Sequence, residues 1–150
     1  MEKNLNIYTY SKKPSNKEKE LIVKFLFENL EQFGDPERDI LKAVDYALNE
    51  YHSFGGMILT TKIDNELVGV AVINYTGMKW YIPENILVYI ATHKKYRGKG
   101  IGKFLMQKAI EMTDGDIALH VEPDNPARFL YEKVGFTSKY LEMRYKKGVD

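Results

Sequence analysis

Residues 97–102, with the sequence Arg-Gly-Lys-Gly-Ile-Gly, constrain the fold of this chain more than any other stretch. They lie between a strand-like segment, 86–92, and a helix-like segment, 101–112. The glycines remove side chains from a turn that opens a helix, where backbone N–H groups lack helical partners and carry partial positive charge. A backbone without Cβ atoms can approach an anion closely. We therefore predict a diphosphate-binding turn, with basic side chains around it: Lys94, Lys95, Arg97, Lys99 and Lys103.

Two common phosphate-binding motifs do not fit this turn. A Walker A loop needs Gly-Lys followed by Ser or Thr, whereas Gly102-Lys103 is followed by Phe104. The dinucleotide fingerprint needs its third glycine at the position of Lys103. The pattern that remains is Arg-x-x-Gly-x-Gly, at Arg97, Gly100 and Gly102. The alternative interpretation is a tight strand-to-helix turn with solvated lysines.

A second segment, residues 120–136, also has a recognisable local pattern. Asn125 is a good helix N-cap, and Pro126 suits the first helical position because an N–H there would have no helical partner. Gly135 follows the helical run and suits a left-handed residue at a helix end. A short apolar run, 117–121, precedes this helix and is expected to be a strand.

The glycine turn and this second segment resemble the two signature motifs of the GCN5-related N-acetyltransferase (GNAT) family, in the same order and at roughly the same separation. The resemblance is strong over 86–136 and elsewhere covers only the order of the elements. It implies an acetyl-CoA-dependent N-acetyltransferase. Such an enzyme transfers an acetyl group by direct attack of a primary amine, on a small molecule, peptide or protein. Acetyl-CoA would be a co-substrate.

The composition restricts the other function classes. With 150 residues, 44% of them apolar, the chain has the size and apolar content of one globular domain, 1–150. Its 22 basic and 21 acidic residues argue against a general nucleic-acid binder. The lack of cysteine excludes disulfides, thiolate metal sites and a cysteine nucleophile, and three dispersed histidines do not suggest a metal site. Without a long apolar run or a leader pattern, we expect no membrane partner and a cytoplasmic location.

Hydrophobic periodicity predicts the element order β-α-α-β-β-β-α-β-α-β. The strand after the glycine-turn helix is expected at 116–121, and the last strand within 136–146. The resemblance implies an α/β fold of the GNAT-like acyl-CoA N-acyltransferase type, in which a central mixed sheet carries helices on both faces. The family often has a seventh strand, which we do not expect in full here.

Local signals set several element boundaries. Ser15 and Glu18 make a capping box for a helix that runs to about residue 33. Asp35, followed by proline, is expected to cap the second helix. The residues 64–66 join two strand-like runs and predict a hairpin.

The resemblance also implies where acetyl-CoA binds. In the family, the central strand parts from the strand that follows the glycine-turn helix, and the pantetheine arm lies between them as a strand would. Here that opening would lie between 87–92 and 119–121, with Ile90 and Thr92 offering backbone groups. Asn125 would reach the pantetheine. The pyrophosphate would bind the turn and helix start: Arg97, Gly98, Lys99, Gly100, Ile101, Gly102 and Lys103.

The resemblance assigns a general acid but leaves the base open. Tyr131 stands where the family places its general acid, and a phenol is protonated at neutral pH and can donate to a departing sulfur. Many relatives carry a glutamate on the central strand, where this chain has Val88. The base remains open among Glu84, His93, Glu122 and an ordered-water relay.

Four aromatic residues fall where the family builds its acceptor pocket: Phe33, Tyr75, Trp80 and Tyr81. Core and loop packing is the alternative for them, and the acceptor itself is not indicated.

Two other functions remain open. One is a non-catalytic acyl-CoA sensor on the same fold, suggested by Val88. The other is a module that binds nucleic acid through the basic glycine turn, which the near-zero net charge disfavours. A homodimer is compatible with each.

Overall fold

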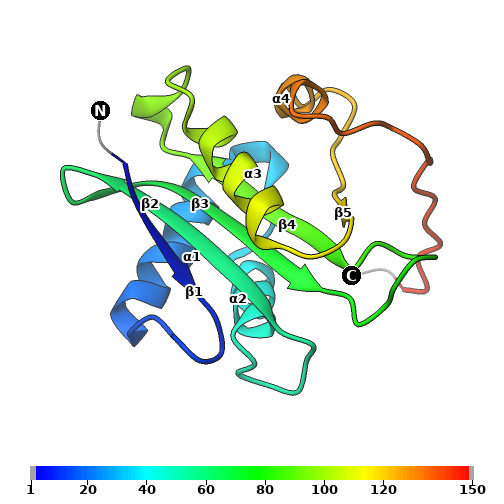
Figure 1. The fold of residues 1–150 in the computed structure, drawn as a ribbon, viewed down its shortest axis with the longest axis horizontal. Coiled ribbons are helices and arrows are strands. Elements are labelled where there is room, and N and C mark those ends of the chain that lie inside the picture. Colours follow the sequence, from blue (N-terminus) through cyan, green and yellow to red (C-terminus); the bar gives the residue numbers. More distant parts are fainter. Residues whose placement is uncertain (1–2, 149–150) are drawn as a thin grey trace.

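The computed structural model describes residues 3–148 (Figure 1). Within this range the elements are β1 (Asn4–Tyr8), α1 (Asn16–Leu30), η1 (Glu31–Phe33), α2 (Glu37–Ala47), β2 (Gly56–Ile63), β3 (Glu66–Tyr75), β4 (Asn85–Thr92), η2 (Lys94–Tyr96), α3 (Ile101–Met112), β5 (Ile117–Ala118) and α4 (Ala127–Lys133). The elements labelled η are short 3-10 helices. The predicted order of strands and α-helices is confirmed from β1 to α4.

All five strands belong to one mixed sheet, in the order β1-β2-β3-β4-β5. Strands β1 to β4 are antiparallel neighbours, and β5 pairs with β4 in parallel. The predicted hairpin is confirmed, because Ile63 of β2 pairs with Glu66 of β3. Asp64 and Asn65 between them both have positive φ, as a tight two-residue hairpin loop requires.

Helices cover both faces of the sheet, as the resemblance implied. Figure 1 shows α1 and α2 behind the sheet and α3 in front of it. The side chains of β3 alternate between these faces: Val70 and Val72 pack in the core with α1 and α2, and Ala71 and Ile73 pack with α3. Because both faces of β3 are buried, a slip of one residue would exchange the two sets, so the packing fixes the register of the strand.

The first two helices begin in different ways. Ser15 Oγ accepts a hydrogen bond from the Glu18 N–H (3.1 Å), and Glu18 Oε1 accepts one from the Ser15 N–H (3.0 Å), so the predicted capping box is confirmed. Asp35 does not cap α2, whose N-cap is Pro36. Its carboxylate instead accepts a hydrogen bond from the hydroxyl of Tyr89 on β4 (2.5 Å), which ties the connection between α1 and α2 to the central strand.

The C-terminal part departs from the predicted pattern at two points. Strand β5 contains only two residues rather than the whole of 116–121. Among the described residues no strand forms within 136–146, so the tenth predicted element is wrong. The residue pattern there fits a strand, but a strand needs a neighbouring edge, and β5 is too short to offer one. Four large side chains of this segment are exposed: Tyr140, Leu141, Met143 and Tyr145.

Candidate active site

Strands β4 and β5, which flank the predicted cofactor site, stay together only at the start of β4. They pair at Asn85–Ile86 and no further. Beyond Ile86, β4 keeps its neighbour β3 as far as Thr92 but has no strand on its other edge among the described residues. The backbone groups of 87–92 on that edge can therefore pair with an extended ligand. Figure 1 shows the chain after β5 diverging from β4 on its way to α4.

A bulge in β4 stands where the two strands part. Tyr89 pairs with Val72, and Leu87 pairs with Ile73, so Val88 is an extra residue on β4. A bulge bends its strand and increases the local twist, which gives a physical reason for the divergence from β5. The position at which many relatives carry a glutamate is thus the bulge residue itself.

The glycine turn has the geometry of an anion-binding site. Gly98 and Gly100 have φ values of +79° and +81°, in the left-handed region that favours glycine. A Cβ atom added at either position would meet nothing within 4 Å, so the turn faces open space. Gly100 is the N-cap of α3, and the first turn of that helix holds no acidic residue. The first N–H groups of α3 therefore fit a diphosphate.

The other residues of the turn divide between the core and the solvent. Ile101 is buried and anchors the start of α3 against the sheet. Lys99 and Lys103 are exposed and hold positive charge beside the turn. A Cβ atom on Gly102 would lie 3.0 Å from Leu130 Cδ2 of α4. A side chain at position 102 would therefore press against Leu130 of α4.

The end of α1 holds the segment that leads into the turn. The buried Asn29 accepts a hydrogen bond from the Lys94 N–H (3.1 Å) and donates one to the Phe25 carbonyl (2.9 Å). Arg97 donates to the Asn29 carbonyl (2.9 Å) and to Glu31 Oε1 (2.9 Å). The guanidinium of Arg97 therefore contacts the C-terminal end of α1, where carbonyl groups lack helical partners. It positions the glycine turn through these contacts.

Two of the candidate bases already accept hydrogen bonds from backbone N–H groups. Glu84 accepts from Asp116 at Oε1 (2.9 Å) and from Trp80 at Oε2 (3.3 Å). These bonds, that of Asp116 first, hold the pKa of Glu84 below its ordinary value, which makes the carboxylate a weaker base. His93 caps η2, and its Nδ1 accepts from the Lys95 N–H (3.1 Å). Both side chains thus accept hydrogen bonds that hold the local backbone in place.

Asn85 fixes the closed end of the opening between β4 and β5. Its buried side chain donates hydrogen bonds to the carbonyls of Asp114 (2.7 Å) and Asp116 (3.1 Å). Its backbone N–H also donates to the Asp116 carbonyl (3.1 Å). These bonds tie the start of β4 to the turn between α3 and β5, and they define where the opening begins.

Tyr131 projects from α4 into the core on the α3 face. Its side chain is only 8% exposed, and its ring centroid lies 6.1 Å from that of Phe136. Burial raises the pKa of Tyr131 to about 12, so its hydroxyl is protonated at neutral pH. The helix begins one residue later than predicted, at Ala127 with Pro126 as its N-cap, although Asn125 Oδ1 accepts a hydrogen bond from the Ala127 N–H (2.9 Å). Gly135 follows the end of the helix with a φ of +115°, as predicted.

A cavity of about 240 Å³ lies on the opposite face, between α2 and the sheet. Its lining consists of Tyr46, Asn74, Tyr75, Thr76, Ile86 and Val88. Ile86 is the last β4 residue paired with β5, and Val88 is the bulge residue. The cavity therefore adjoins β4 at the point where its edge becomes free.

The four aromatic residues predicted for the acceptor site are not gathered together. Tyr75 lines the cavity, and Phe33 is half-buried in η1. Trp80 and Tyr81 are 86% and 80% exposed in the connection between β3 and β4. The Nζ of Lys79 lies 5.2 Å from the Trp80 ring centroid, a contact made at the surface. In this structure only Tyr75 of the four is placed next to β4 and the cavity.

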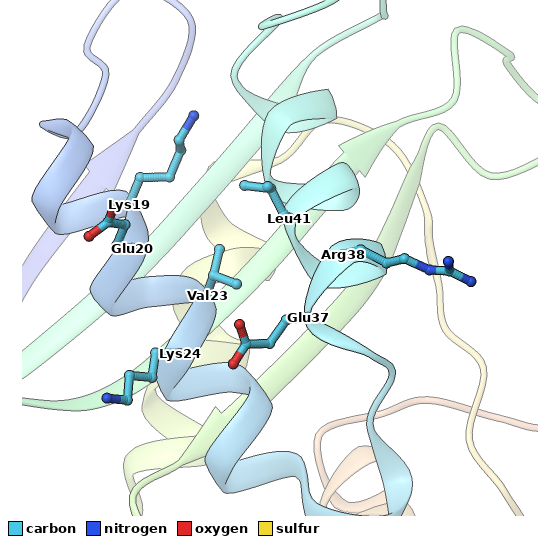
Figure 2. Close-up of a pocket in the computed structure, with 7 residues that line it drawn as sticks. All are labelled: Lys19, Glu20, Val23, Lys24, Glu37, Arg38 and Leu41. Atoms are coloured by element: carbon cyan, nitrogen blue, oxygen red, sulfur yellow. The ribbon is translucent and has the colours of Figure 1, made fainter.

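A larger hollow, of about 390 Å³, lies between α1 and α2. Figure 2 shows its lining, in which Lys19, Glu20, Lys24, Glu37 and Arg38 accompany Val23 and Leu41. It includes no residue of β4, the glycine turn or α4, so we do not assign it to the reaction. Within residues 3–148, no group of three or more metal-ligating side chains could hold a metal ion, and none of the helices described could span a membrane.

The sequence matches the model of the acetyltransferase (GNAT) family over residues 22–136, which is more than half of the chain. The chain therefore belongs to the GNAT acetyltransferase family. Members of this family use acetyl-CoA, and the open glycine turn and the free edge of β4 fit that molecule.

Two curated relatives carry more specific names. The chain is 33% identical to N-alpha-acetyltransferase 30 of Xenopus laevis over 105 residues, which cover 66% of this chain and 38% of that protein. It is 34% identical to the ribosomal protein bS18-alanine N-acetyltransferase of Haemophilus influenzae over 86 residues, or 55% of this chain and 56% of that protein. The chain thus spans between about two fifths and somewhat more than half of these relatives.

Solved structures share the fold at lower identity. An aminoglycoside N-acetyltransferase in complex with CoA superposes with a TM-score of 0.70 and 15% identity, covering 97% of this chain and 95% of that one. A ribosomal-protein-alanine N-acetyltransferase from Brucella melitensis gives a TM-score of 0.64 and 18% identity, covering 98% and 100%. These two proteins differ in their named substrates, so the likeness establishes the fold alone.

The residues that sequence reasoning missed include three asparagines. Asn29 follows Phe25 by one helical turn on the apolar side of α1, and Asn74 is in phase with Val70 and Val72 on the α2 face of β3. Asn85 stands at the start of β4. The available signal was a polar residue at a position that the periodicity marks as apolar. Their hydrogen-bond partners gave no signal, because most of them lie far away in the sequence.

Proposed function

We propose that this chain transfers an acetyl group from acetyl-CoA to the α-amino group of a peptide or protein. The observation that carries the proposal is the free edge of β4 beside the open glycine turn, in a chain that belongs to an acetyltransferase family. The names of the two sequence relatives, an N-alpha-acetyltransferase and an alanine N-acetyltransferase of a ribosomal protein, support an α-amino group as the acceptor.

In this proposal the first N–H groups of α3 bind the diphosphate, and Lys99 and Lys103 add positive charge. The free edge of β4, with Ile90 and Thr92, binds the extended pantetheine arm by backbone hydrogen bonds. The Asn125 Oδ1 already accepts a hydrogen bond from the Ala127 N–H, which leaves the amide N–H groups of Asn125 to donate to the arm.

The reaction forms a bond from the amine nitrogen to the thioester carbon and breaks the bond from that carbon to sulfur. Negative charge develops on the carbonyl oxygen, and a backbone N–H on the free edge of β4 donates a hydrogen bond to it. The Tyr131 hydroxyl donates its proton to the departing sulfur. With a pKa of about 12, the hydroxyl of Tyr131 carries its proton at neutral pH.

The proton of the acceptor amine leaves through water in this proposal. Glu84 and His93 accept backbone hydrogen bonds, and Val88 has no carboxylate to offer. Glu122 is exposed to solvent. The rate should then rise with pH along the ionisation of the acceptor amine itself, near pH 8 for an α-amino group.

Acetyl-CoA binding and peptide acetylation test the proposal together. Acetyl-CoA at a hundred times its dissociation constant should stabilise the fold by about 2.7 kcal/mol, whereas ATP and NAD should give no shift in melting temperature. A peptide with a free N-terminus and one internal lysine should release CoA thiol and gain one acetyl group at its N-terminus. The same peptide with a blocked N-terminus is the control.

Two results would contradict the proposal at different levels. Comparable turnover of the blocked peptide, or of an aminoglycoside in preference to either peptide, would overturn the α-amino acceptor. A melting shift with ATP or NAD but none with acetyl-CoA would overturn acetyl transfer altogether.

The presence of valine at the bulge favours one alternative, a non-catalytic acyl-CoA sensor. Such a protein would show the melting shift with acetyl-CoA but no thiol release above the buffer rate with any amine. The two readouts therefore separate the sensor from the enzyme.

A further inference from the structure

His93 joins the end of β4 to the segment that leads into the glycine turn. Its backbone N–H donates to the Val68 carbonyl (2.8 Å), which extends the pairing of β4 with β3 by one residue. Its carbonyl accepts from the Tyr96 N–H (2.8 Å), and its Nδ1 accepts from the Lys95 N–H (3.1 Å) as the N-cap of η2. Three hydrogen bonds of one residue therefore connect the sheet to η2, which is followed directly by the glycine turn.

The imidazole ring packs against two aromatic rings. Its centroid lies 6.3 Å from that of Phe25, a buried residue of α1, and 5.7 Å from that of Tyr96, at an interplanar angle of 85°. A hydrogen bond to Glu66 of β3 raises the pKa of the Tyr96 phenol. The Nζ of Lys99, in the glycine turn, lies 6.0 Å from the Tyr96 ring centroid. The ring of His93 therefore belongs to a group of contacts that extends from α1 to the turn.

Only the neutral form of this imidazole can accept the bond from Lys95. Because Nδ1 accepts the Lys95 N–H, the neutral ring carries its proton on Nε2. A second proton would bind Nδ1, and both nitrogens of an imidazolium are donors. The backbone N–H of Lys95 would then face another N–H group and lose its partner. Histidine is the side chain that ordinarily takes up such a proton between pH 8 and pH 5.

The segments around the ring carry charges of both signs. On the segment of His93 itself these are Lys94, Lys95 and Arg97. On the neighbouring segments they are Glu28 and Glu31 at the end of α1 and in η1, Asp64 and Glu66 at the β2–β3 hairpin, and Lys99 in the turn. None of the ion pairs found among the described residues includes His93. Protonation would therefore cost the bond from Lys95 without the gain of an ion pair.

We propose that His93 is a positioning residue for the acetyl donor: the neutral ring holds η2 and the glycine turn in the conformation that binds the diphosphate, and its protonation weakens acetyl-CoA binding. The inference rests on the proposed function and adds to it a control of the same site by pH. His93 acts through the turn and does not take the proton of the acceptor amine.

The expected loss of affinity is modest. An N-cap hydrogen bond contributes about 1 kcal/mol, which corresponds to about a fivefold change in the dissociation constant. The positive charge of the imidazolium would attract the diphosphate and so act in the opposite direction. Because the ring is only half-buried, solvent and salt screen that attraction, and the loss of the hydrogen bond is the larger effect.

Calorimetric titration with acetyl-CoA at pH 8.0 and pH 5.5 tests the proposal in the wild type and in His93→Asn. Asparagine is a good N-cap that can accept the Lys95 N–H and does not titrate in this range. Its pH dependence therefore measures the other titrating groups, including the 3′-phosphate of CoA, since a phosphate monoester takes up its second proton near about pH 6. From pH 8.0 to pH 5.5, the affinity of the wild type should fall about fivefold more than that of His93→Asn.

His93→Phe makes the complementary change. It keeps a ring beside Phe25 and Tyr96 but removes the Nδ1 acceptor, so at pH 8.0 it should bind acetyl-CoA about fivefold more weakly than the wild type. On acidification it should lose no more affinity than His93→Asn. His52→Asn, at an exposed histidine between α2 and β2, is the matched control and should keep the pH profile of the wild type.

Two outcomes would overturn the role of His93 alone. One is an equal fall in affinity in the wild type and His93→Asn, and the other is tighter binding by the wild type at pH 5.5 than at pH 8.0. If the wild type binds no acetyl-CoA at either pH, the proposed function fails and the inference fails with it. Thermal melting of each protein at both pH values shows whether the variants are folded when affinity is measured.

Discussion

The part of the chain up to α3 and the part that follows it are built in different ways. In the first part, β2 and β3 pair along their lengths and helices cover both of their faces. In the second, β5 has two residues, and Tyr131 is the one buried residue of α4. The described residues after Phe136 form neither helix nor strand. Beyond Ile86, the backbone groups on the outer edge of β4 therefore have no strand to pair with among the described residues, and this is the edge where acetyl-CoA is proposed to bind.

This difference suggests that the two parts have different roles in ligand binding. The first part holds the glycine turn in place through Asn29 and Arg97 at the end of α1. The second part supplies Tyr131, the one buried residue of the short helix α4, and Asn125 just before that helix. Elements with few buried contacts open with small free energies, so a ligand between the two parts should order the second more than the first.

Gly100→Val should have the largest effect. The isopropyl group would occupy the open space above the turn and remove two or more charge-assisted hydrogen bonds to a diphosphate, which lowers acetyl-CoA affinity by about 10³-fold. Because Gly100 has a φ of +81°, the left-handed backbone also costs roughly 1–2 kcal/mol with any side chain. Calorimetric titration with acetyl-CoA measures the first effect, and thermal melting measures the second.

Gly135→Val separates backbone strain from ligand contact. Gly135 also has a positive φ and open space around its Cβ position, but it lies at the end of α4. The Gly135→Val protein should be less stable than the wild type but should bind acetyl-CoA with nearly the same affinity. Equal affinity in Gly100→Val and the wild type would mean that the diphosphate binds elsewhere.

Tyr131→Phe should be next in size. It removes the proposed proton donor and keeps the buried ring, so kcat should fall about 10²-fold while acetyl-CoA affinity and melting temperature barely change. Steady-state thiol release gives kcat, and single-turnover measurement gives the rate constant of the chemical step. Tyr145→Phe, at an exposed position after α4, is the control and should be fully active. Full activity in Tyr131→Phe would reduce Tyr131 to a packing role and assign protonation of the thiolate to solvent.

The two parts also differ in how far the sequence predicts them. The capping box at Ser15, the hairpin turn at 64–65 and, to within one residue, the start of α4 were predictable, because the bonds that make them join residues close in the sequence. The glycine turn was predictable for the same reason. A positive φ at alternate positions needs glycine, and glycine is visible in the sequence.

Bonds between distant residues were not predictable in this way. Tyr89 donates to Asp35, and Lys94 donates to Asn29, across connections that single-sequence periodicity does not encode. For the residues that follow Phe136, the sequence predicted a strand that does not form. Their side chains suit a strand, but pairing depends on an edge elsewhere in the molecule, so residue pattern alone predicted an element that the structure lacks.

A smaller effect is expected in the alkaline stability of the second part. Burial raises the pKa of Tyr131 from 10.0 to about 12, so the folded state keeps a proton that the unfolded state loses. The resulting contribution is fully present below pH 10 and is lost as the pH rises through 12, by about 3 kcal/mol in total. Urea unfolding at pH 9 and pH 11 should show a smaller loss in Tyr131→Phe than in the wild type. An identical loss in both proteins would contradict the burial of the hydroxyl.

Arg97→Gln should have a small effect, and it tests which part of the molecule this side chain serves. The sequence resemblance assigns Arg97 to the diphosphate, but the guanidinium contacts the Asn29 carbonyl and Glu31 at the end of α1. The pair is partly exposed, so the free energy of unfolding should fall by only about 1 kcal/mol. Acetyl-CoA affinity should fall less than about threefold, because the first N–H groups of α3 remain in place.

Two further variants complete the Arg97 test. Glu31→Gln removes the partner of Arg97 and should lower stability by a smaller amount, with unchanged acetyl-CoA affinity. Lys103→Gln removes an exposed charge beside the turn. It should lower acetyl-CoA affinity and leave stability unchanged, since the Lys103 side chain makes no ion pair with a described residue. A loss of acetyl-CoA affinity of about tenfold or more in Arg97→Gln, with unchanged stability, would show that the guanidinium leaves α1 to bind the diphosphate. The first part of the chain would then take part in ligand binding directly, and the separation between a supporting part and a ligand-binding part would fail at this residue.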